Sequence, residues 1–180
     1  MANIPELLHR AFSVFCFKDS KLLLQQRALE KITFPGCWTN SCCSHPLWRP
    51  DEMIQKAHLG VRNACVRKLE HELGVATASI DINKLQFLTR IHYVAPSDGE
   101  WGEHEIDYIF IYNSPLELEP NPNEVMETRY VTRQELAEML EDPNIPITPW
   151  FKLIAETFLF KWWDNLEQLE QFSDSEIHRL

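Results

Sequence analysis

The chain has 180 residues and a mass of 21.2 kDa, which is enough to bury a substantial core, and we predict a single domain over residues 1–180. Hydrophobic residues make up 44% and charged residues 24%, a composition that excludes a disordered chain. Lys and Arg total 17 against 27 Asp and Glu, and the net charge of −10 argues against a general nucleic-acid binder.

The first predicted elements are two strands, over residues 11–17 and 21–27, joined by a hairpin at Asp19-Ser20. Both arms are apolar and partly β-favouring, and the joint between them is short and polar. Phe34-Pro35-Gly36 then breaks the chain, and residues 38–43 form a short extended segment.

A helix is expected after Pro50, with Asp51 as its N-cap and Gly74 as its stop. Apolar residues fall near helical spacing along it and predict its buried stripe. These residues are Met53, Ile54, Ala57, Val61, Ala64, Cys65 and Leu69.

Two long strands are predicted next, over residues 84–94 and 103–112, joined by a turn at 96–102. Residues 113–128 contain three prolines among acidic residues and are predicted to be a surface loop.

The last predicted elements are helical. Thr132 and Glu135 form a capping box that opens a short helix ending near Leu140, and Thr148-Pro149 opens a final long helix. The order of strands, helix, strands and helices predicts an α+β fold, or an α/β/α sandwich with a mixed sheet.

Residues 38–46 place a thiol two residues before an imidazole, next to hydroxyl groups: Cys43 and His45 follow Asn40 and Ser41. Such a group is typical of thiol acid–base chemistry or of a metal site. A structural zinc module is disfavoured because the segment has no second pair of spaced ligands. The alternative is a strand of small buried residues.

Glu103, Glu105 and Asp107 recur at the period of a strand and therefore share one face. Stacked carboxylates repel one another unless a cation lies among them or one of them stays protonated. The alternative is the solvated outer face of an edge strand.

Two pairs of residues could serve a phosphorylated ligand. Arg27 and Lys31, just after a strand, could hold a diphosphate through charge-assisted hydrogen bonds, or could be a solvated face. Lys68 and Glu72 lie one helical turn apart on one helix face. They could form an ordinary ion pair, or Glu72 could bind a metal that is bridged to phosphates.

Several segments together resemble the type I isopentenyl diphosphate isomerases, a branch of the Nudix superfamily, and most of all the eukaryotic members. The resemblance extends over essentially the whole chain, and its most specific blocks are Asn-x-x-Cys-x-His and Trp-Gly-Glu-x-Glu. It is carried by Leu7–Phe12, Thr33–Gly36, Thr39–Pro46, Leu88–Tyr93, Trp101–Tyr108, Thr148–Phe151 and Phe160–Asp164, with a degenerate Nudix box at Arg67–Val75.

The resemblance implies an α/β (α+β) fold, a Nudix-like α/β/α sandwich with a mixed central sheet. It also implies the interconversion of isopentenyl and dimethylallyl diphosphate, by protonation and deprotonation through a tertiary carbocation. Such an isomerase belongs to isoprenoid biosynthesis, sterol biosynthesis included.

The resemblance also assigns roles to residues at matching positions. Cys43 matches the catalytic thiol, Glu105 the catalytic carboxylate, Tyr93 its hydrogen-bond donor and Trp150 the aromatic ring facing the cation. The matching diphosphate contacts are Arg27, Lys31, Ser44 and Lys68.

The metal ligands implied are His9, His45, Glu103 and Glu105, for Mg²⁺ or Mn²⁺ with Zn²⁺ as an alternative. Glu72 and the Cys43 carbonyl match the site of a second Mg²⁺ carried on the substrate diphosphate. The sequence departs from the family in two ways. No histidine or lysine precedes His9, so we expect a shortened N-terminus, and Lys68 and His71 stand where Nudix enzymes have carboxylates.

Two alternative functions remain open. One is an inactive, shortened homologue that binds prenyl diphosphates, and the other is a Nudix diphosphate hydrolase, for which Glu72 alone keeps a matching place. The expected partner is a small prenyl diphosphate, without nucleic acid or membrane, and the expected state is a monomer.

The expected compartment is the cytosol. No apolar stretch reaches the roughly 20 residues of a membrane helix, and the first ten residues lack the apolar run of a signal peptide. Five cysteines with no secretion signal indicate free thiols in a reducing compartment. A peroxisomal location is the alternative, because the His178-Arg179-Leu180 end loosely resembles a peroxisomal signal.

Overall fold

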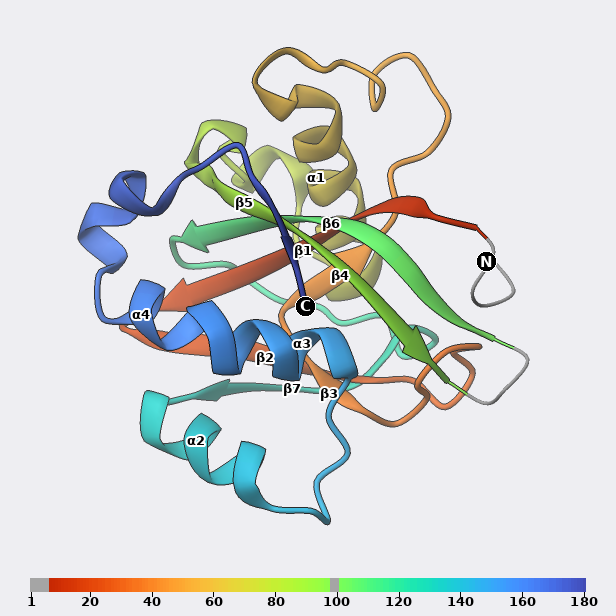
Figure 1. Cartoon of the computed structure of the whole chain (residues 1–180), viewed down its shortest axis with the longest axis vertical. Helices are drawn as coiled ribbons and strands as arrows, with labels where there is room; N and C mark the ends of the chain where they lie inside the picture. Colours follow the sequence, from red (N-terminus) through yellow and green to blue (C-terminus); the bar gives the residue numbers. More distant parts are fainter. Residues whose placement is uncertain (1–6, 98–100) are drawn as a thin grey trace.

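The computed structural model describes residues 7–97 and 101–180 (Figure 1). Within them the strands form one mixed eight-stranded sheet in the order β3-β2-β1-β6-β5-β8, with β4 paired to β1 and β7 paired to β2. The strands are β1 His9–Lys18, β2 Lys21–Arg27, β3 Trp38–Thr39, β4 Cys42–Ser44, β5 Leu85–Pro96, β6 Gly102–Asn113, β7 Val125–Val131 and β8 Ile177–Arg179.

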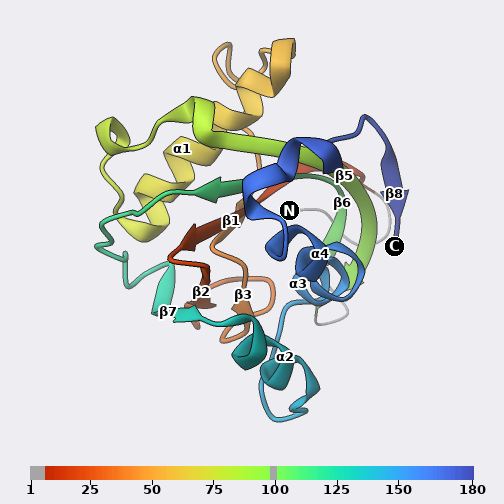
Figure 2. The ribbon, with the colours of Figure 1, turned by 90° about the vertical axis from the view of Figure 1, so that its left-hand side faces the viewer.

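Helices cover both faces of the sheet, with α1 on one side and α3 and α4 on the other (Figure 2). The predicted α/β/α sandwich with a mixed sheet is therefore confirmed, since β1 pairs in parallel with β6 and antiparallel with β2. The α-helices are α1 Leu59–Leu73, α2 Arg133–Glu141, α3 Pro149–Ile154 and α4 Phe160–Trp163, and a π-helical turn, Ala155–Leu159, joins the last two. Short 3₁₀ turns lie at Lys56–His58, Thr77–Ser79, Ile82–Lys84 and Leu166–Phe172.

Alternate residues of β1 serve two separate hydrophobic cores. Phe12 and Val14 pack in the core beneath α1, whereas Phe15 and Phe17 pack in the core beneath α3 and α4. This alternation is the period of two that any strand imposes. Successive residues of β1 therefore face opposite cores.

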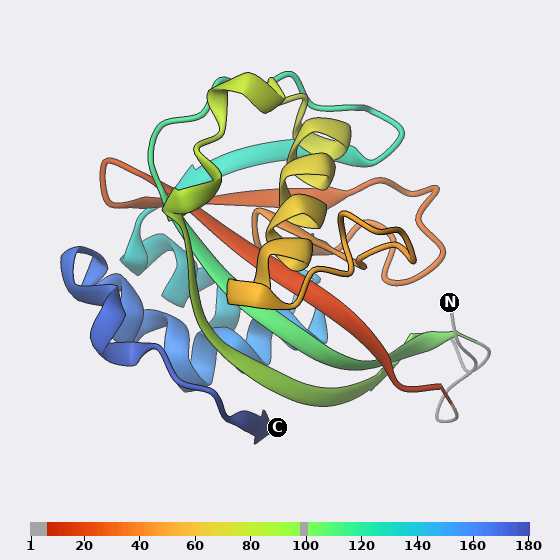
Figure 3. The ribbon, with the colours of Figure 1, turned by 90° about the horizontal axis from the view of Figure 1, so that it is seen from above.

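Strand β1 changes partner along its length. Its last residues, Phe17 and Lys18, pair with β2, while Phe12–Val14 pair with β4. On its other edge β1 pairs in parallel with β6 from His9 to Phe17, and Figure 3 shows these two long strands beside the antiparallel β5. The sheet therefore splits between β2 and β4.

Several local predictions are confirmed. The first two strands form the expected hairpin, and β5 and β6 pair antiparallel, although residues 98–100 of the predicted 96–102 turn lie outside the described residues. Thr132 and Glu135 form the capping box of α2, and Pro149 is the first residue of α3.

The predicted start of the α1 helix is wrong. The helix begins at Leu59, not after Asp51, because Ala57 and His58 have the left-handed φ values 51° and 57° and interrupt any earlier helix. Its end is as predicted, since Gly74 adopts φ 64° at the C-cap.

Two other predictions need correction. The extended segment 38–43 is two strands, because Asn40 and Ser41 bond to Val14 and Leu23 carbonyls while the chain crosses from β2 to β1. The predicted loop 113–128 ends early, since Val125 already begins β7 on the edge of β2. Strand β8 had no signal in the sequence.

No helix within residues 7–97 and 101–180 combines the length and the apolarity that crossing a membrane would require.

Candidate active site

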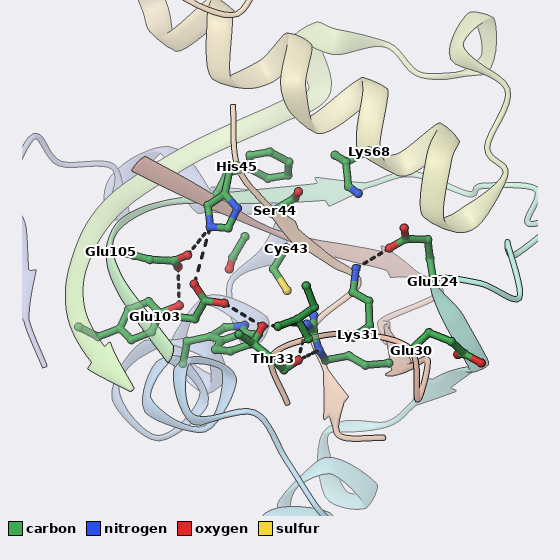
Figure 4. Close-up of a pocket in the computed structure, with 16 residues that line it drawn as sticks. Glu30, Lys31, Thr33, Cys43, Ser44, His45, Lys68, Glu103, Glu105 and Glu124 are labelled. Carbon is green, nitrogen blue, oxygen red and sulfur yellow. Dashed lines mark hydrogen bonds and ion pairs between the residues drawn. The ribbon is translucent and has the colours of Figure 1, made fainter. Parts of the chain in front are cut away.

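A cavity of about 340 Å³ opens where the sheet splits (Figure 4). Ten of the twelve residues predicted for the site line it: Arg27, Lys31, Cys43, Ser44, His45, Lys68, Tyr93, Glu103, Glu105 and Trp150. The other two, His9 and Glu72, contact residues that line it. The structure thus brings together groups that lie far apart in the sequence.

Four side chains at one end of the cavity form what we call the His/Glu cluster: His9, His45, Glu103 and Glu105. One donor atom of each lies within 4.8 Å of all the others. Glu105 Oε1 lies 2.5 Å from His45 Nε2 and 3.2 Å from His9 Nε2. His9 is on β1, both glutamates are on β6, and His45 directly follows β4. The cluster therefore forms where the end of β4 meets the central strands β1 and β6.

The His/Glu cluster fits a divalent cation. Two imidazole nitrogens and two carboxylates are donors that Mn²⁺ and Zn²⁺ accept, and carboxylates also suit Mg²⁺. Glu103 Oε2 is buried without a hydrogen-bond partner among the described residues, and it lies 3.4 Å from His9 Nε2. His9 Nδ1 lies 3.0 Å from the Leu7 carbonyl, which turns the other ring nitrogen toward the carboxylates.

Without a metal, protons hold the His/Glu cluster together. Hydrogen bonds that His9 donates to Glu103 and Glu105 raise the pKa of His9 to about 10, against a smaller opposing effect of burial. Burial acts to raise the pKa of Glu105, but hydrogen bonds from His45, His9 and Tyr93 outweigh it and lower that pKa to about 2. A cation at this position would have to displace the His9 proton.

Tyr93 and Asp107 flank Glu105. The Tyr93 hydroxyl donates to Glu105 Oε2 at 2.5 Å, and burial, followed by the charge of Glu105, raises the pKa of Tyr93 well above its usual range. Glu103, Glu105 and Asp107 share one face as predicted, but Asp107 lies outside the His/Glu cluster. Burial, and then the charge of Glu105, raises its pKa, and Ser13 donates to it at 2.7 Å.

Cys43 lies in the middle of the cavity, between the His/Glu cluster and a group of lysines and glutamates (Figure 4). Burial raises the pKa of its thiol to about 12, although Arg27 acts in the opposite direction. Cys43 is therefore protonated at neutral pH. Cys42 faces the α1 core instead, with its sulfur 3.6 Å from Glu72 Oε2.

Trp150, the second residue of α3, forms one wall of the cavity. Its Nε1 donates to Asn40 Oδ1 at 3.2 Å, and its ring centre lies 5.3 Å from that of Phe34 and 6.2 Å from that of Tyr93. The Arg27 guanidinium carbon lies 5.6 Å from the indole centre. These contacts fix the indole in an aromatic, electron-rich wall.

The opposite end of the cavity holds what we call the Lys/Glu cluster: Lys31, Lys68, Glu72 and Glu124. Lys68 Nζ lies 2.9 Å from Glu72 Oε1, and Lys31 Nζ lies 3.9 Å from the same oxygen. Lys31 also forms an ion pair with Glu124. Each ammonium group is therefore already neutralised by a carboxylate.

Six of the residues that line the cavity had no predicted role, and two of them, Glu124 and Thr33, contact predicted site residues. Glu124 lies in the turn directly before β7, inside the predicted loop, and no sequence signal placed it beside Lys31. Thr33 donates to Glu103 Oε1 at 2.8 Å, and its carbonyl accepts from Arg27 at 2.7 Å. Thr33 belongs to a segment of the family resemblance, which was the one signal available for it.

Comparison with known proteins agrees with this arrangement. Residues 7–151 match the NUDIX domain. The chain is 55% identical to an isopentenyl-diphosphate delta-isomerase of Phaffia rhodozyma, covering 100% of this chain and 78% of that protein. It is 56% identical to the isopentenyl-diphosphate delta-isomerase of Schizosaccharomyces pombe, covering 99% and 80%, and 55% identical to isopentenyl-diphosphate Delta-isomerase 1 of Mus musculus, covering 97% and 79%.

Among solved structures, a NUDIX hydrolase from Alicyclobacillus acidocaldarius superimposes with a TM-score of 0.68 at 10% identity, covering 93% of this chain and 97% of the other. A MutT NUDIX hydrolase from Burkholderia pseudomallei gives a TM-score of 0.60 at 18% identity, covering 86% and 100%. At these identities the likeness concerns the fold alone. The fold is that of the NUDIX domain, and the near-complete matches at 55% identity and above establish that the chain belongs to the isopentenyl-diphosphate delta-isomerase family.

Proposed function

We propose that this chain interconverts isopentenyl diphosphate and dimethylallyl diphosphate. Three relatives that match nearly the whole chain carry the name of that isomerase. The observation that carries the proposal is a pair of proton carriers in one cavity with opposite protonation states. The pKa of Cys43 is raised to about 12 and that of Glu105 is lowered to about 2.

An allylic shift requires one group that delivers a proton to the terminal carbon of the alkene. A second group must remove a proton from the CH2 carbon on the other side of the substituted alkene carbon. A buried thiol and a buried carboxylate can do this if they face opposite sides of the substrate. In this proposal Cys43 and Glu105 are those two groups. Tyr93, whose hydroxyl donates to Glu105 at 2.5 Å, keeps the carboxylate oriented and can exchange a proton with it.

Protonation of the alkene leaves a tertiary carbocation, which needs a stabilising wall and no water. The indole face of Trp150 supplies an attraction of about 2 kcal/mol when the site is desolvated. Phe34 and Tyr93 pack around that indole and help to exclude the water that would convert the cation to an alcohol.

The diphosphate requires a cationic anchor at a distance from the alkene. Lys31 and Lys68 lie on the side of Cys43 away from His45 and Glu105 (Figure 4). We assign them to this task together with Arg27 and Ser44, which also line the cavity. Glu72 with the Cys43 carbonyl is our proposed position for a second Mg²⁺ that arrives with the diphosphate. The ammonium groups must leave Glu72 and Glu124 when the ligand binds.

We further propose that the His/Glu cluster holds a divalent metal, Mg²⁺ or Mn²⁺, with Zn²⁺ as the alternative. The cation would supply positive charge that keeps Glu103 and Glu105 ionised and fixed. The mixture of imidazole and carboxylate ligands supports each of these ions, and metal analysis of the purified chain by mass spectrometry would distinguish them.

One assay tests the proposed function against its competitors. The purified chain is incubated with isopentenyl diphosphate and Mg²⁺ or Mn²⁺, and the products are separated. Dimethylallyl diphosphate supports the isomerase, free phosphate indicates a diphosphate hydrolase, and bound but unchanged substrate indicates an inactive binding protein.

We infer a cytosolic enzyme that acts as a monomer with one catalytic domain, and a peroxisomal location is the alternative. Strands from both ends of the described chain, β1 and β8, join the same sheet, which supports a single domain. Light scattering after gel filtration tests the monomer, and microscopy of a tagged chain with and without its last three residues tests the compartment.

A further inference from the structure

The segment between β4 and α1, residues 45–58, carries one of the four residues of the His/Glu cluster and contains a carboxylate that the proposed reaction does not use. Glu52 is 0% exposed in this long loop. A buried carboxylate is costly unless it is fully paired, so its partners show what it holds in place.

Both oxygens of Glu52 are saturated with donors. Oε1 lies 2.6 Å from Arg67 Nε and 2.6 Å from Arg49 Nη2. Oε2 accepts from Arg67 Nη2 at 3.0 Å and from the Leu47 amide at 2.7 Å. Burial opposes ionisation, but these donors, Arg67 first among them, keep the pKa of Glu52 below its ordinary value. The Arg67 contact is a two-pronged ion pair between the loop and α1.

The same pairing reaches His45 by two routes. Arg67 Nη2, while bound to Glu52, also donates to the His45 carbonyl at 3.1 Å. The Leu47 amide that binds Glu52 lies two residues beyond His45 in the chain. The backbone that follows the His45 imidazole is therefore fixed to α1 through the Glu52–Arg67 pair.

Glu52 also reaches the segment of His9. Arg10, the next residue along β1, donates from Nη2 to the Glu52 carbonyl at 3.2 Å. The loop backbone packs so closely on α1 here that a Cβ on Gly60 would lie 2.3 Å from the Glu52 carbonyl oxygen. Glu52 thus contacts both histidine-bearing segments and the start of the helix.

We propose that Glu52 is a positioning residue, which through Arg67 and Arg10 holds His45 and His9 at the separation that a divalent cation requires. This inference rests on the metal site of the proposed function. His45 belongs to a loop, and a loop side chain becomes a precise ligand only when neighbouring contacts lock its backbone. Glu52 supplies that lock without touching metal or substrate.

The test measures binding of Mn²⁺ alone, without substrate, by electron paramagnetic resonance of the free ion. In Glu52→Gln the side chain keeps its shape but loses the charge that holds Arg67. We expect Mn²⁺ affinity to fall about tenfold, which is the usual cost of removing an outer partner of a metal ligand. At saturating Mn²⁺ the turnover number of the variant should return to within about twofold of wild type, since no reacting group has changed.

Arg67→Lys is the second variant, and it also decides the matter if Glu52→Gln does not fold. A lysine keeps the charge but lacks the planar fork that binds both Glu52 oxygens, so we expect a similar loss of Mn²⁺ affinity. Arg49→Gln is the matched control, because the Arg49 side chain binds the same carboxylate oxygen from within the loop and ties it to neither α1 nor β1. Its Mn²⁺ affinity should stay within about twofold of wild type.

Two results would overturn the inference. One is a lowered melting temperature in Glu52→Gln and Arg67→Lys with unchanged Mn²⁺ affinity, which would make the pair a purely structural one. The other is a wild-type chain that binds no Mn²⁺. If the chain binds Mn²⁺, the variants weaken that binding, and no dimethylallyl diphosphate is formed, the positioning role stands and the proposed function falls.

Discussion

The two ends of the cavity are built in different ways. In the His/Glu cluster, three of four side chains project from the long strands β1 and β6, and the fourth is tied to α1 through Glu52 and Arg67. In the Lys/Glu cluster, Lys31 comes from a loop and Lys68 from a helix, and their partners are carboxylates that a ligand must replace.

The difference indicates two tasks. Side chains on paired strands hold their positions closely, which suits groups that must meet a reacting carbon. The Lys31–Glu124 pair is partly exposed, and such ion pairs contribute little stability and exchange readily, which suits a cation that must transfer from a carboxylate to a diphosphate. We expect substitutions at the first end to change mainly kcat or metal affinity, and substitutions at the second end to change mainly KM.

The largest expected effect tests the proton carriers of the first task. Cys43→Ala should lower kcat by about 10² to 10⁴-fold, the usual contribution of a positioned proton donor, with little change in diphosphate affinity. Cys42→Ala is the control, because the Cys42 sulfur faces the α1 core. Steady-state kinetics with isopentenyl diphosphate checks both, and equal losses at the two positions would remove the distinction between the neighbouring thiols.

The second effect is a pH dependence confined to the His/Glu cluster. A metal ion binds only the neutral imidazole of His9, whose pKa is about 10 in the metal-free chain. Below that pH, His9 must therefore lose a proton when the metal binds. Mn²⁺ affinity should therefore weaken tenfold for each unit of acidification, or roughly a hundredfold between pH 8 and pH 6. Mn²⁺ titrations across this range check it, together with calorimetry in two buffers to count the released proton. An affinity that falls only below pH 6.5 would contradict the raised pKa.

A smaller effect is expected at the wall between the two ends. Replacing Trp150 by Phe keeps an aromatic face but a weaker one, so kcat should fall by less than the roughly 30-fold that about 2 kcal/mol represents. Trp150→Ala should approach that value, with KM nearly constant because the cation forms only after proton transfer. Trp162→Phe is the control, since Trp162 is as buried as Trp150 but does not line the cavity. A rise in KM at constant kcat would make Trp150 a simple lining residue.

At the Lys/Glu cluster, Lys31→Gln should raise KM about tenfold with kcat nearly unchanged, because a charge-assisted hydrogen bond contributes about 1.5 kcal/mol or more. Lys152→Gln removes an exposed lysine that pairs with Glu156 outside the cavity and should leave KM unchanged. Binding of inorganic pyrophosphate by calorimetry gives an independent measure. If kcat rather than KM changes, the two ends do not divide the work as proposed.

The smallest effect has the opposite sign. Glu124→Gln releases Lys31 from its carboxylate, so KM should fall by about two- to threefold, within the range of a partly exposed ion pair. Glu30→Gln removes the same charge from the same cavity and controls for the change in net charge. A KM that rises in Glu124→Gln would mean that Glu124 holds Lys31 in its binding position rather than competing for it.

Much of this molecule follows from local rules of sequence. The hairpin at Asp19-Ser20, the capping box of Thr132 and Glu135, and the stop at Gly74 were predicted because each depends on a few neighbouring residues. Strand alternation similarly predicted that Glu103 and Glu105 share a face. Family resemblance supplied the site residues, ten of which line one cavity.

Other features depended on contacts between distant segments. The start of α1 at Leu59 was missed, because left-handed residues and the packing of the Glu52 backbone on Gly60, not local propensity, delay the helix. Glu124 lies in the predicted loop, just before β7, but its partner Lys31 is 93 residues away in the sequence. No local pattern could have paired them.

The sequence by itself determined which side chains could bind a metal and the alternation that places Glu103 and Glu105 on one face, since these follow from residue identity and the period of two of a strand. The proposed roles of Cys43 and Glu105 as proton carriers came from the family resemblance. Only the tertiary structure decided which charges meet: Lys31 with Glu124, and Glu52 with Arg67. The physical reason is that the two members of each pair lie on separate segments. The path of those segments is set by burial and hydrogen bonding elsewhere in the fold. A buried carboxylate such as Glu52 accepts whichever donors the fold brings within about 3 Å of it.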